Sequence, residues 1–101
     1  MSFNLKIMTP QGLVFEGEVS SFTAPGSNGY FGVLTSHAPM VSAIGTGVLK
    51  VDTGGDTQYY AVSGGITEIT REGNIILADM VKKVSDPSEA ETVLDELSFS
   101  A

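Results

Sequence analysis

The sequence predicts a mainly β fold, a flattened antiparallel β-sandwich or barrel of about ten short strands followed by one short C-terminal helix. Short apolar runs recur from Phe3 to about Val84, with turn residues between them roughly every 8–12 residues. Beyond residue 85 the apolar period changes from two to that of a helix. We therefore expect a β-sandwich over 1–84 and an acidic tail over 85–101 with a helix at 86–97.

The strands are predicted from alternation and from the turns that separate them. Phe3, Leu5 and Ile7 alternate with other residues, which predicts a strand with one buried face, and a turn follows at 10–12. A break is expected at Gly17, a loop at 25–29, hairpin turns at 52–56 and 71–74, and a further break at 63–65. The remaining strand candidates are 13–15, 19–23, 30–34, 40–44, 48–51, 58–62, 66–70 and 75–78.

The tail carries the signals of a helix start. Asp86 suits the N-cap, Pro87 the first helical position, and Glu89 completes a pattern that resembles a capping box. One apolar stripe follows at i, i+3, i+4 and i+7, formed by Ala90, Val93, Leu94 and Leu97. Because about three turns of helix are marginal alone, we expect this stripe to pack on the sandwich.

Composition excludes several classes of function. The net charge is −7, and residues 85–101 contribute five acids and no base, so nucleic acid and anionic lipid are excluded as partners of the whole chain. The chain has no cysteine, which rules out disulfides, zinc–thiolate sites and a thiol nucleophile. No apolar stretch approaches the ~20 residues of a membrane span, and the N-terminus lacks the pattern of a signal peptide.

Candidate catalytic and metal-binding motifs are weak. His37 is the single histidine, and Ser36 beside it points to the opposite face of an extended chain. The glycines at 26, 29 and 32 precede an apolar run rather than a helix, and no Walker lysine follows. Asp52 and Asp56 lack the spacing of a calcium loop. We therefore predict no catalytic residue, no metal and no cofactor.

Aromatic residues offer an alternative reading. Tyr30 and Phe31 directly follow the 25–29 loop, and alternation allows one of them to face the core and the other a binding surface. A small ligand- or carbohydrate-binding sandwich could use Tyr30, Tyr59 or Tyr60 as stacking platforms. Adjacent Tyr59 and Tyr60 should point to opposite faces, so at most one of them joins a shared platform.

Several segments together resemble the epsilon subunit of F-type ATP synthases. The most specific are the loop with Gly26, Gly29 and Gly32 and the later triplet His37-Ala38-Pro39. The segments KIMTP (6–10), FEGEV (15–19), AIGTG (43–47), SGGI (63–66) and ILAD (76–79) continue the resemblance in the same order. It covers residues 3–84.

The resemblance implies a non-catalytic rotor subunit of the central stalk that links the gamma subunit to the c ring and supports the coupling of proton or sodium transport to ATP synthesis. It also implies a peripheral position on the cytoplasmic face of a bacterial inner membrane, with an organelle membrane as the alternative. The residues that resemble the c-ring contact are Ser27, Asn28, Gly29, Tyr30 and Phe31. Those that resemble the gamma-facing surface are Thr9, Pro10, His37, Ala38, Pro39 and Met40.

Two departures from the family pattern qualify what is implied. Many members carry an acidic residue where this chain has Tyr30, which predicts a more apolar ring contact. The family's C-terminal helix pair is represented only by 86–97, and the motif that accompanies ATP binding in some relatives is absent. The chain thus resembles the short members of the family, or a shortened form, without the inhibitory helical hairpin.

Overall fold

The computed structural model describes residues 2–26, 29–34 and 39–100, which form eight strands and one helix. Mainly β architecture with one C-terminal helix is confirmed, and the chain forms eight strands where about ten were predicted. The elements are β1 (Phe3–Thr9), β2 (Gly12–Val19), β3 (Ser21–Gly26), β4 (Gly29–Leu34), β5 (Met40–Ile44), β6 (Gly47–Asp52), β7 (Thr57–Ile69), β8 (Asn74–Val84) and α1 (Pro87–Ser100).

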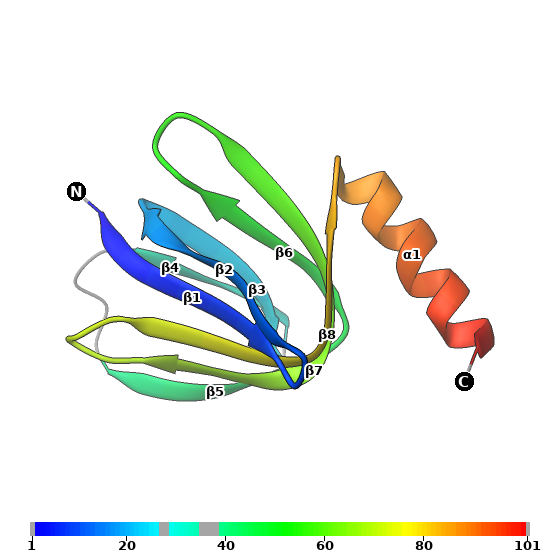
Figure 1. Cartoon of the computed structure of the whole chain (residues 1–101), viewed down its shortest axis with the longest axis horizontal. Helices are drawn as coiled ribbons and strands as arrows, with labels where there is room; N and C mark the ends of the chain where they lie inside the picture. Colours follow the sequence, from blue (N-terminus) through cyan, green and yellow to red (C-terminus); the bar gives the residue numbers. More distant parts are fainter. Residues whose placement is uncertain (1, 27–28, 35–38, 101) are drawn as a thin grey trace.

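The long β7–β8 hairpin takes part in both layers of the sandwich (Figure 1). The C-terminal half of β7 pairs with β5, and the start of β8 pairs with β1, which in turn pairs with β2. The N-terminal half of β7 pairs instead with β6, which pairs with β3, and β3 pairs with β4. We call β2, β1, β8, β7 and β5 the first layer, and β4, β3, β6 and the other halves of β7 and β8 the second layer.

The core lies between the two layers and draws side chains from both. Tyr60 and Val62 of β7 face this core, whereas Tyr59 and Ala61 face the outer side of the second layer, as the period of two requires. The buried cluster consists of Leu5, Ile7, Val19, Phe22, Ala24, Val33, Ile44, Leu49, Val51, Tyr60, Val62, Ile69 and Ile76. Alternation therefore sets which side chains hold the layers together.

The predicted break at Ser63-Gly64-Gly65 is wrong, because β7 runs through it as a 13-residue strand. Gly64 and Gly65 have φ values of 66° and 138°, which favour glycine. A Cβ on Gly64 would lie 2.6 Å from Asp79 Oδ2, and one on Gly65 would collide with the Leu77 carbonyl oxygen. The glycines allow β7 to pass from one layer to the other without ending the ladder to β8.

The break predicted at Gly17 is also wrong. Gly17 lies inside β2 opposite Leu5, and the Phe15 ring packs where its side chain would be, 3.3 Å from an added Cβ. The chain leaves β2 at Ser20 instead, whose N–H donates to the Asp52 carbonyl at 2.7 Å. The break therefore moves without changing the number of strands, and it is the uninterrupted β7, which replaces the predicted strands 58–62 and 66–70, that lowers the count to eight.

One strand pair departs from the predicted antiparallel pattern. β1 pairs with β8 in parallel, with Leu5 opposite Asn74 and Met8 opposite Leu77. The other pairs in the described part of the chain are antiparallel. The 52–56 turn is confirmed as the β6–β7 hairpin, in which the Thr53 N–H donates to the Asp56 carbonyl at 2.9 Å.

Helix α1 starts where the capping residues predict and packs on the outer side of the second layer (Figure 1). The Glu89 N–H donates to Asp86 Oδ1 at 2.8 Å, which confirms Asp86 as the N-cap. The helix runs to Ser100 rather than to 97. Ala90 and Val93 are buried and Leu94 packs beside them, whereas the side chain of Leu97 lies outside the described part. Their partners on the sheet are Val48, Tyr59, Ala61 and Val84.

Candidate partner-binding surface

A line of apolar side chains crosses the outer side of the first layer. Its members are paired directly across neighbouring strands, so their side chains share one face. Leu13, Leu77 and Ile66 are 54%, 43% and 40% exposed. In strand order the set, here called the apolar row, is Leu13, Met8, Leu77, Ile66 and Ala43. Contiguous exposed apolar surface of this kind marks interaction sites.

A β-bulge in β2 places Leu13 in the apolar row. The register shifts after Ile7, which pairs with Phe15, so that Met8 pairs with Leu13 and Val14 is left as the extra residue. Without the bulge, Val14 would stand opposite Met8. Bulges of this kind re-aim a side chain at the cost of one ladder position. This rearrangement brings a longer side chain onto the apolar face.

The row beside the apolar row is mixed in character. It contains Val41, which is 65% exposed, together with charged residues. Across the strands it runs Glu16, Lys6, Ile75, Glu68 and Val41. Sequence reasoning missed the outward-facing residues of both rows, because alternation within one strand does not reveal its neighbours.

Two predicted contact segments lie at the same end of the sandwich. Thr9 and Pro10 follow the apolar-row residue Met8, in a turn where the Gln11 N–H donates to Thr9 Oγ1 at 3.1 Å. Gly26, which closes the β3–β4 hairpin opposite Gly29, pairs with Ile44. Ile44 pairs in turn with Gly65 on β7, and Gly65 pairs with Ala78 on β8, the residue after Leu77. The structure thus brings Thr9, Pro10 and Gly29 to the end where the apolar row lies.

Tyr30 and Phe31 point in opposite directions, as alternation allowed. Phe31 packs partly against the core, whereas Tyr30 is 59% exposed. The Tyr30 hydroxyl accepts a hydrogen bond from the Val48 N–H at 3.0 Å, and it sits where Gly47 leaves room, 2.6 Å from an added Cβ. Tyr30 is therefore a surface aromatic held in place by the backbone of β6.

The other predicted gamma-facing residues lie at the opposite end of β5. Pro39 is exposed, and Met40 packs partly against the core opposite Ile69. Beside Met40, Val41 is the residue that faces outward on the first layer. The predictions at Ser27, Asn28, His37 and Ala38 lie outside the described residues.

The three tyrosines of the alternative reading do not share a surface. Tyr60 is buried in the core, where burial raises the pKa of its hydroxyl, and it donates to Gln58 Oε1 at 2.7 Å. Tyr59 packs in the cluster under α1. Tyr30 alone stays on an open surface, so the arrangement offers no shared stacking platform.

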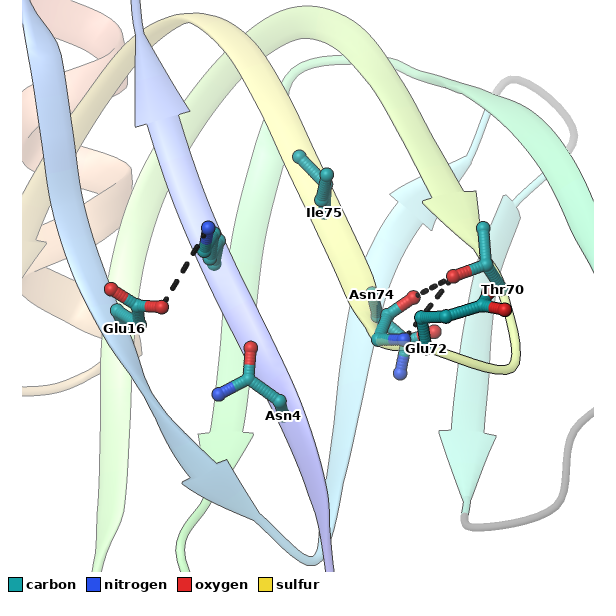
Figure 2. Close-up of a pocket in the computed structure, with 8 residues that line it drawn as sticks. Asn4, Glu16, Thr70, Glu72, Asn74 and Ile75 are labelled. Carbon is teal, nitrogen blue, oxygen red and sulfur yellow. Dashed lines mark hydrogen bonds and ion pairs between the residues drawn. The ribbon is translucent and has the colours of Figure 1, made fainter.

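A polar hollow of about 350 Å³ lies on the first layer, between the β1–β2 pair and the β7–β8 turn. Figure 2 shows Glu16 and Asn4 on one side of it and Thr70 and Glu72 at the turn on the other. Lys6 Nζ lies 3.7 Å from Glu16 Oε2, and the turn is closed by the Thr70 hydroxyl, which donates to the Gly73 carbonyl at 2.6 Å. The lining is Asn4, Lys6, Glu16, Thr70, Glu72, Gly73, Asn74 and Ile75.

The described residues offer neither a metal-binding cluster nor a membrane-spanning helix. Residues 2–26, 29–34 and 39–100 contain no group of three or more histidine, aspartate or glutamate side chains placed to hold a metal ion. Within the same residues, the helix is too short and too polar to cross a bilayer.

Known proteins have sequences similar to this one. The epsilon chain of ATP synthase from Rhodopseudomonas palustris (strain BisA53) is 44% identical over 85 residues, covering 84% of this chain and 63% of that protein. The epsilon chain from Bradyrhizobium sp. (strain ORS 278) is 37% identical over 99 residues, covering 98% of this chain and 68% of that protein. The chain thus spans somewhat less than two thirds of the Rhodopseudomonas relative.

Two solved assemblies contain a chain of the same fold. One is the Euglena gracilis mitochondrial ATP synthase, OSCP/F1/c-ring, with a TM-score of 0.77, 22% identity, and coverage of 94% of this chain and 62% of that one. The other is the Tetrahymena thermophila mitochondrial ATP synthase central stalk and c-ring, with a TM-score of 0.68, 13% identity and coverage of 78% and 64%. Residues 2–84 match the family described as "ATP synthase, Delta/Epsilon chain, beta-sandwich domain", and the chain belongs to that family.

Proposed function

We propose that this chain is a non-catalytic central-stalk subunit of an F-type ATP synthase, which links the gamma subunit to the c ring and supports the coupling of ion transport to ATP synthesis. Membership of the delta/epsilon family supports the proposal. The structural observation that carries it is the apolar row, in which exposed apolar side chains of neighbouring strands share the outer face of the first layer. The protein would lie at the membrane surface through the complex, on its cytoplasmic side.

The apolar row and the adjoining Thr9-Pro10 turn are the proposed gamma-facing surface. Leu77 and Ile66 lie near the centre of the row, where desolvation on binding is greatest. Pro39 and Met40 lie at the far end of β5, so a partner that touched both segments would span the length of the first layer. The His37 and Ala38 contacts remain part of the proposal.

The β3–β4 hairpin with residues 27–31 is the proposed c-ring contact. Its supporting feature is Tyr30, an exposed aromatic fixed by the Val48 amide and by the space at Gly47. An aromatic side chain whose conformation is already fixed loses little conformational entropy when a partner binds. Because Gly29 and the apolar row lie at the same end of the sandwich, one rigid body would contact both partners and resist slippage between them.

The test is light scattering coupled to size-exclusion chromatography of the chain mixed with the cognate gamma subunit. We expect a one-to-one complex, which Leu77→Asp should abolish, because a charge placed on the apolar row would be buried unpaired. Tyr30→Ser is the matched control, since it truncates a large exposed side chain outside this surface and should leave the complex intact. Failure of two folded proteins to co-elute at physiological salt would refute the proposal.

A further inference from the structure

The strand order of the first layer suits the outer face of this layer to pairing with a second copy of itself. The order is β2, β1, β8, β7 and β5, so β8 is central and has two strands on either side. Neighbouring strands in a sheet are evenly spaced, about 4.8 Å apart. A second copy related by a twofold axis along β8 would therefore lay its β7 over β1 and its β5 over β2. Such contacts are isologous, which means that each occurs twice with the two copies exchanged.

The apolar row is complementary to itself under this rotation. Leu77 lies on the axis and faces Leu77 of the second copy, and beside it Met8 faces Ile66 of the second copy. At the ends of the row, Leu13 faces Ala43, so a large side chain meets a small one. Leu13, Leu77 and Ile66 are the exposed members, and their contact would remove apolar surface from water.

The charges of the adjoining row are complementary as well. This row, here called the mixed row, runs across the strands as Glu16, Lys6, Ile75, Glu68 and Val41. With the axis along β8, Ile75 faces its own copy, Lys6 faces Glu68 of the second copy, and Glu68 faces Lys6 of the second copy. Packed sheets lie about 10 Å apart, a distance that a lysine and a glutamate can bridge together. Glu68 is exposed, and the Lys6 side chain is 44% exposed although its Nζ lies 3.7 Å from Glu16 Oε2.

The charges distinguish this arrangement from the other twofold pairing of the same face. An axis along the apolar row would lay each strand over its own copy. Lys6 would then lie over Pro10 and Glu68 over Gly64 of the second copy, so neither charge would meet an opposite one. Opposite charges placed at equal distances from β8 therefore select the axis along β8.

We propose that free copies of this chain associate face to face through the apolar row and the mixed row, about a twofold axis along β8, into a weak homodimer. The inference goes beyond the proposed function, since it concerns the chain before it meets the gamma subunit. Both contacts use the apolar row, so a chain in the homodimer cannot bind the gamma subunit through that surface.

The size of the contact predicts that the homodimer is weak. Two rows across five strands cover an area of about 24 Å by about 14 Å on each copy. The surface buried in total is then below the roughly 1,200 Å² of standard interfaces, in the range of transient complexes. We expect half of the chains to be paired only at a concentration on the order of 100 μM. At low micromolar concentration the chain is a monomer and the apolar row is open.

The experiment is sedimentation velocity of the full chain between about 5 and about 500 μM, where the wild-type chain should pass reversibly from monomer towards dimer. Lys6→Glu and Glu68→Lys each set like charges opposite one another in both contacts, and should weaken association at least about tenfold. An equimolar mixture of these two variants should regain the wild-type association, because both contacts of the mixed dimer join opposite charges. This gain should shrink at about 500 mM salt, where the screening length is short.

Glu91→Lys is the matched control for Glu68→Lys. It makes the same change of net charge on an exposed position of α1, and should alter the association constant by less than about twofold. Circular dichroism verifies the fold of each variant. Glu68 is exposed, so Glu68→Lys tests the contact by itself if Lys6→Glu, which stands opposite Glu16, does not fold.

Three outcomes would overturn the homodimer. A wild-type chain that stays monomeric at about 500 μM would exclude it. A dimer that tolerates Glu68→Lys as well as it tolerates Glu91→Lys would use another surface. Two folded single variants that gain nothing on mixing would exclude the axis along β8. Each of these results leaves the proposed function standing, because binding to the gamma subunit is measured separately with the chain at low micromolar concentration.

Discussion

The outer faces of both layers carry apolar side chains, but they differ in whether a described element of the chain covers them. On the second layer, Val48, Ala61 and Val84 form an apolar patch that α1 covers with Ala90 and Val93. On the first layer, the apolar row of Leu13, Met8, Leu77, Ile66 and Ala43 has no covering element among the described residues. The chain thus supplies its own cover for one face, and the other face is the one that we propose a partner covers. Apolar alternation marks a buried side, but the neighbour that buries it need not belong to the same chain.

The largest effect is expected from a substitution that disrupts the passage of β7 between the two layers. Gly65→Ala places a Cβ against the Leu77 carbonyl oxygen at a φ of 138°, so the crossing of β7 between layers should fail. We expect a loss above roughly 4 kcal/mol or no folded protein, measured by urea denaturation. Gly55→Ala is the control and should be nearly neutral, because nothing lies within 4 Å of its added Cβ.

The second prediction makes the same chemical change on each layer. Val93→Asp buries a charge between α1 and the sheet, and should lower Tm by about 5–15 °C in thermal unfolding. Leu77→Asp introduces its charge on the open face and should change the free energy of unfolding by less than about 0.5 kcal/mol. Equal destabilisation by the two would show that the apolar row is covered within the isolated chain.

The third prediction sharpens the role of the helix start. Asp86→Ala removes the acceptor of the Glu89 N–H and should cost about 1 kcal/mol in the free energy of unfolding. Asp86→Asn should keep most of that stability, because asparagine is an equally good N-cap. If the alanine and asparagine variants had the same free energy of unfolding in denaturant titrations, the Asp86 cap would not contribute to the stability of α1 on the second layer.

The smallest predicted effect concerns alkaline pH and the core between the layers. Burial raises the pKa of Tyr60, so the unfolded chain releases its proton first as pH rises past about 10. The folded state then holds more protons than the unfolded state, and the tyrosine's contribution to stability falls above that pH. We expect the loss of unfolding free energy between about pH 9 and 11 to be smaller in Tyr60→Phe. An identical pH dependence in both proteins would contradict this.

Local signals in the sequence predicted the parts of the fold that depend on local chemistry. The Asp52–Asp56 turn and the Asp86 cap were predicted correctly, because each rests on residues within one turn of each other. Gly17 and Gly64 were misread as breaks, because glycine serves both to end strands and to admit a close neighbour. Which of these roles applies depends on the atoms that pack beside the glycine in the fold, here the Phe15 ring at Gly17 and the Asp79 carboxylate at Gly64.

The candidate site was only partly predictable for the same reason. Tyr30 could be singled out as a surface aromatic, but its bond to the Val48 amide depends on the path of β6 beside β3. The apolar row requires knowing that Met8 stands between Leu13 and Leu77, which follows from a bulge and from a parallel pairing. Neither feature has a signature within one segment of the sequence. Register between strands far apart in the chain therefore limits the prediction of this surface.

The parallel pairing of β1 with β8 also sets the order in which the protein can be completed during synthesis. Residues 5–8 find partners on their β8 side only at residues 74–77, nearly at the end of the β region. While the chain emerges from the ribosome, the β1–β2 hairpin has one unpaired edge, and the apolar side chains of Leu5 and Ile7 are not yet buried. Closing so long a loop is slow and follows most of translation. The nascent chain is thus most prone to aggregate before residue 77 leaves the exit tunnel, and ribosome-associated chaperones should bind it chiefly in that interval.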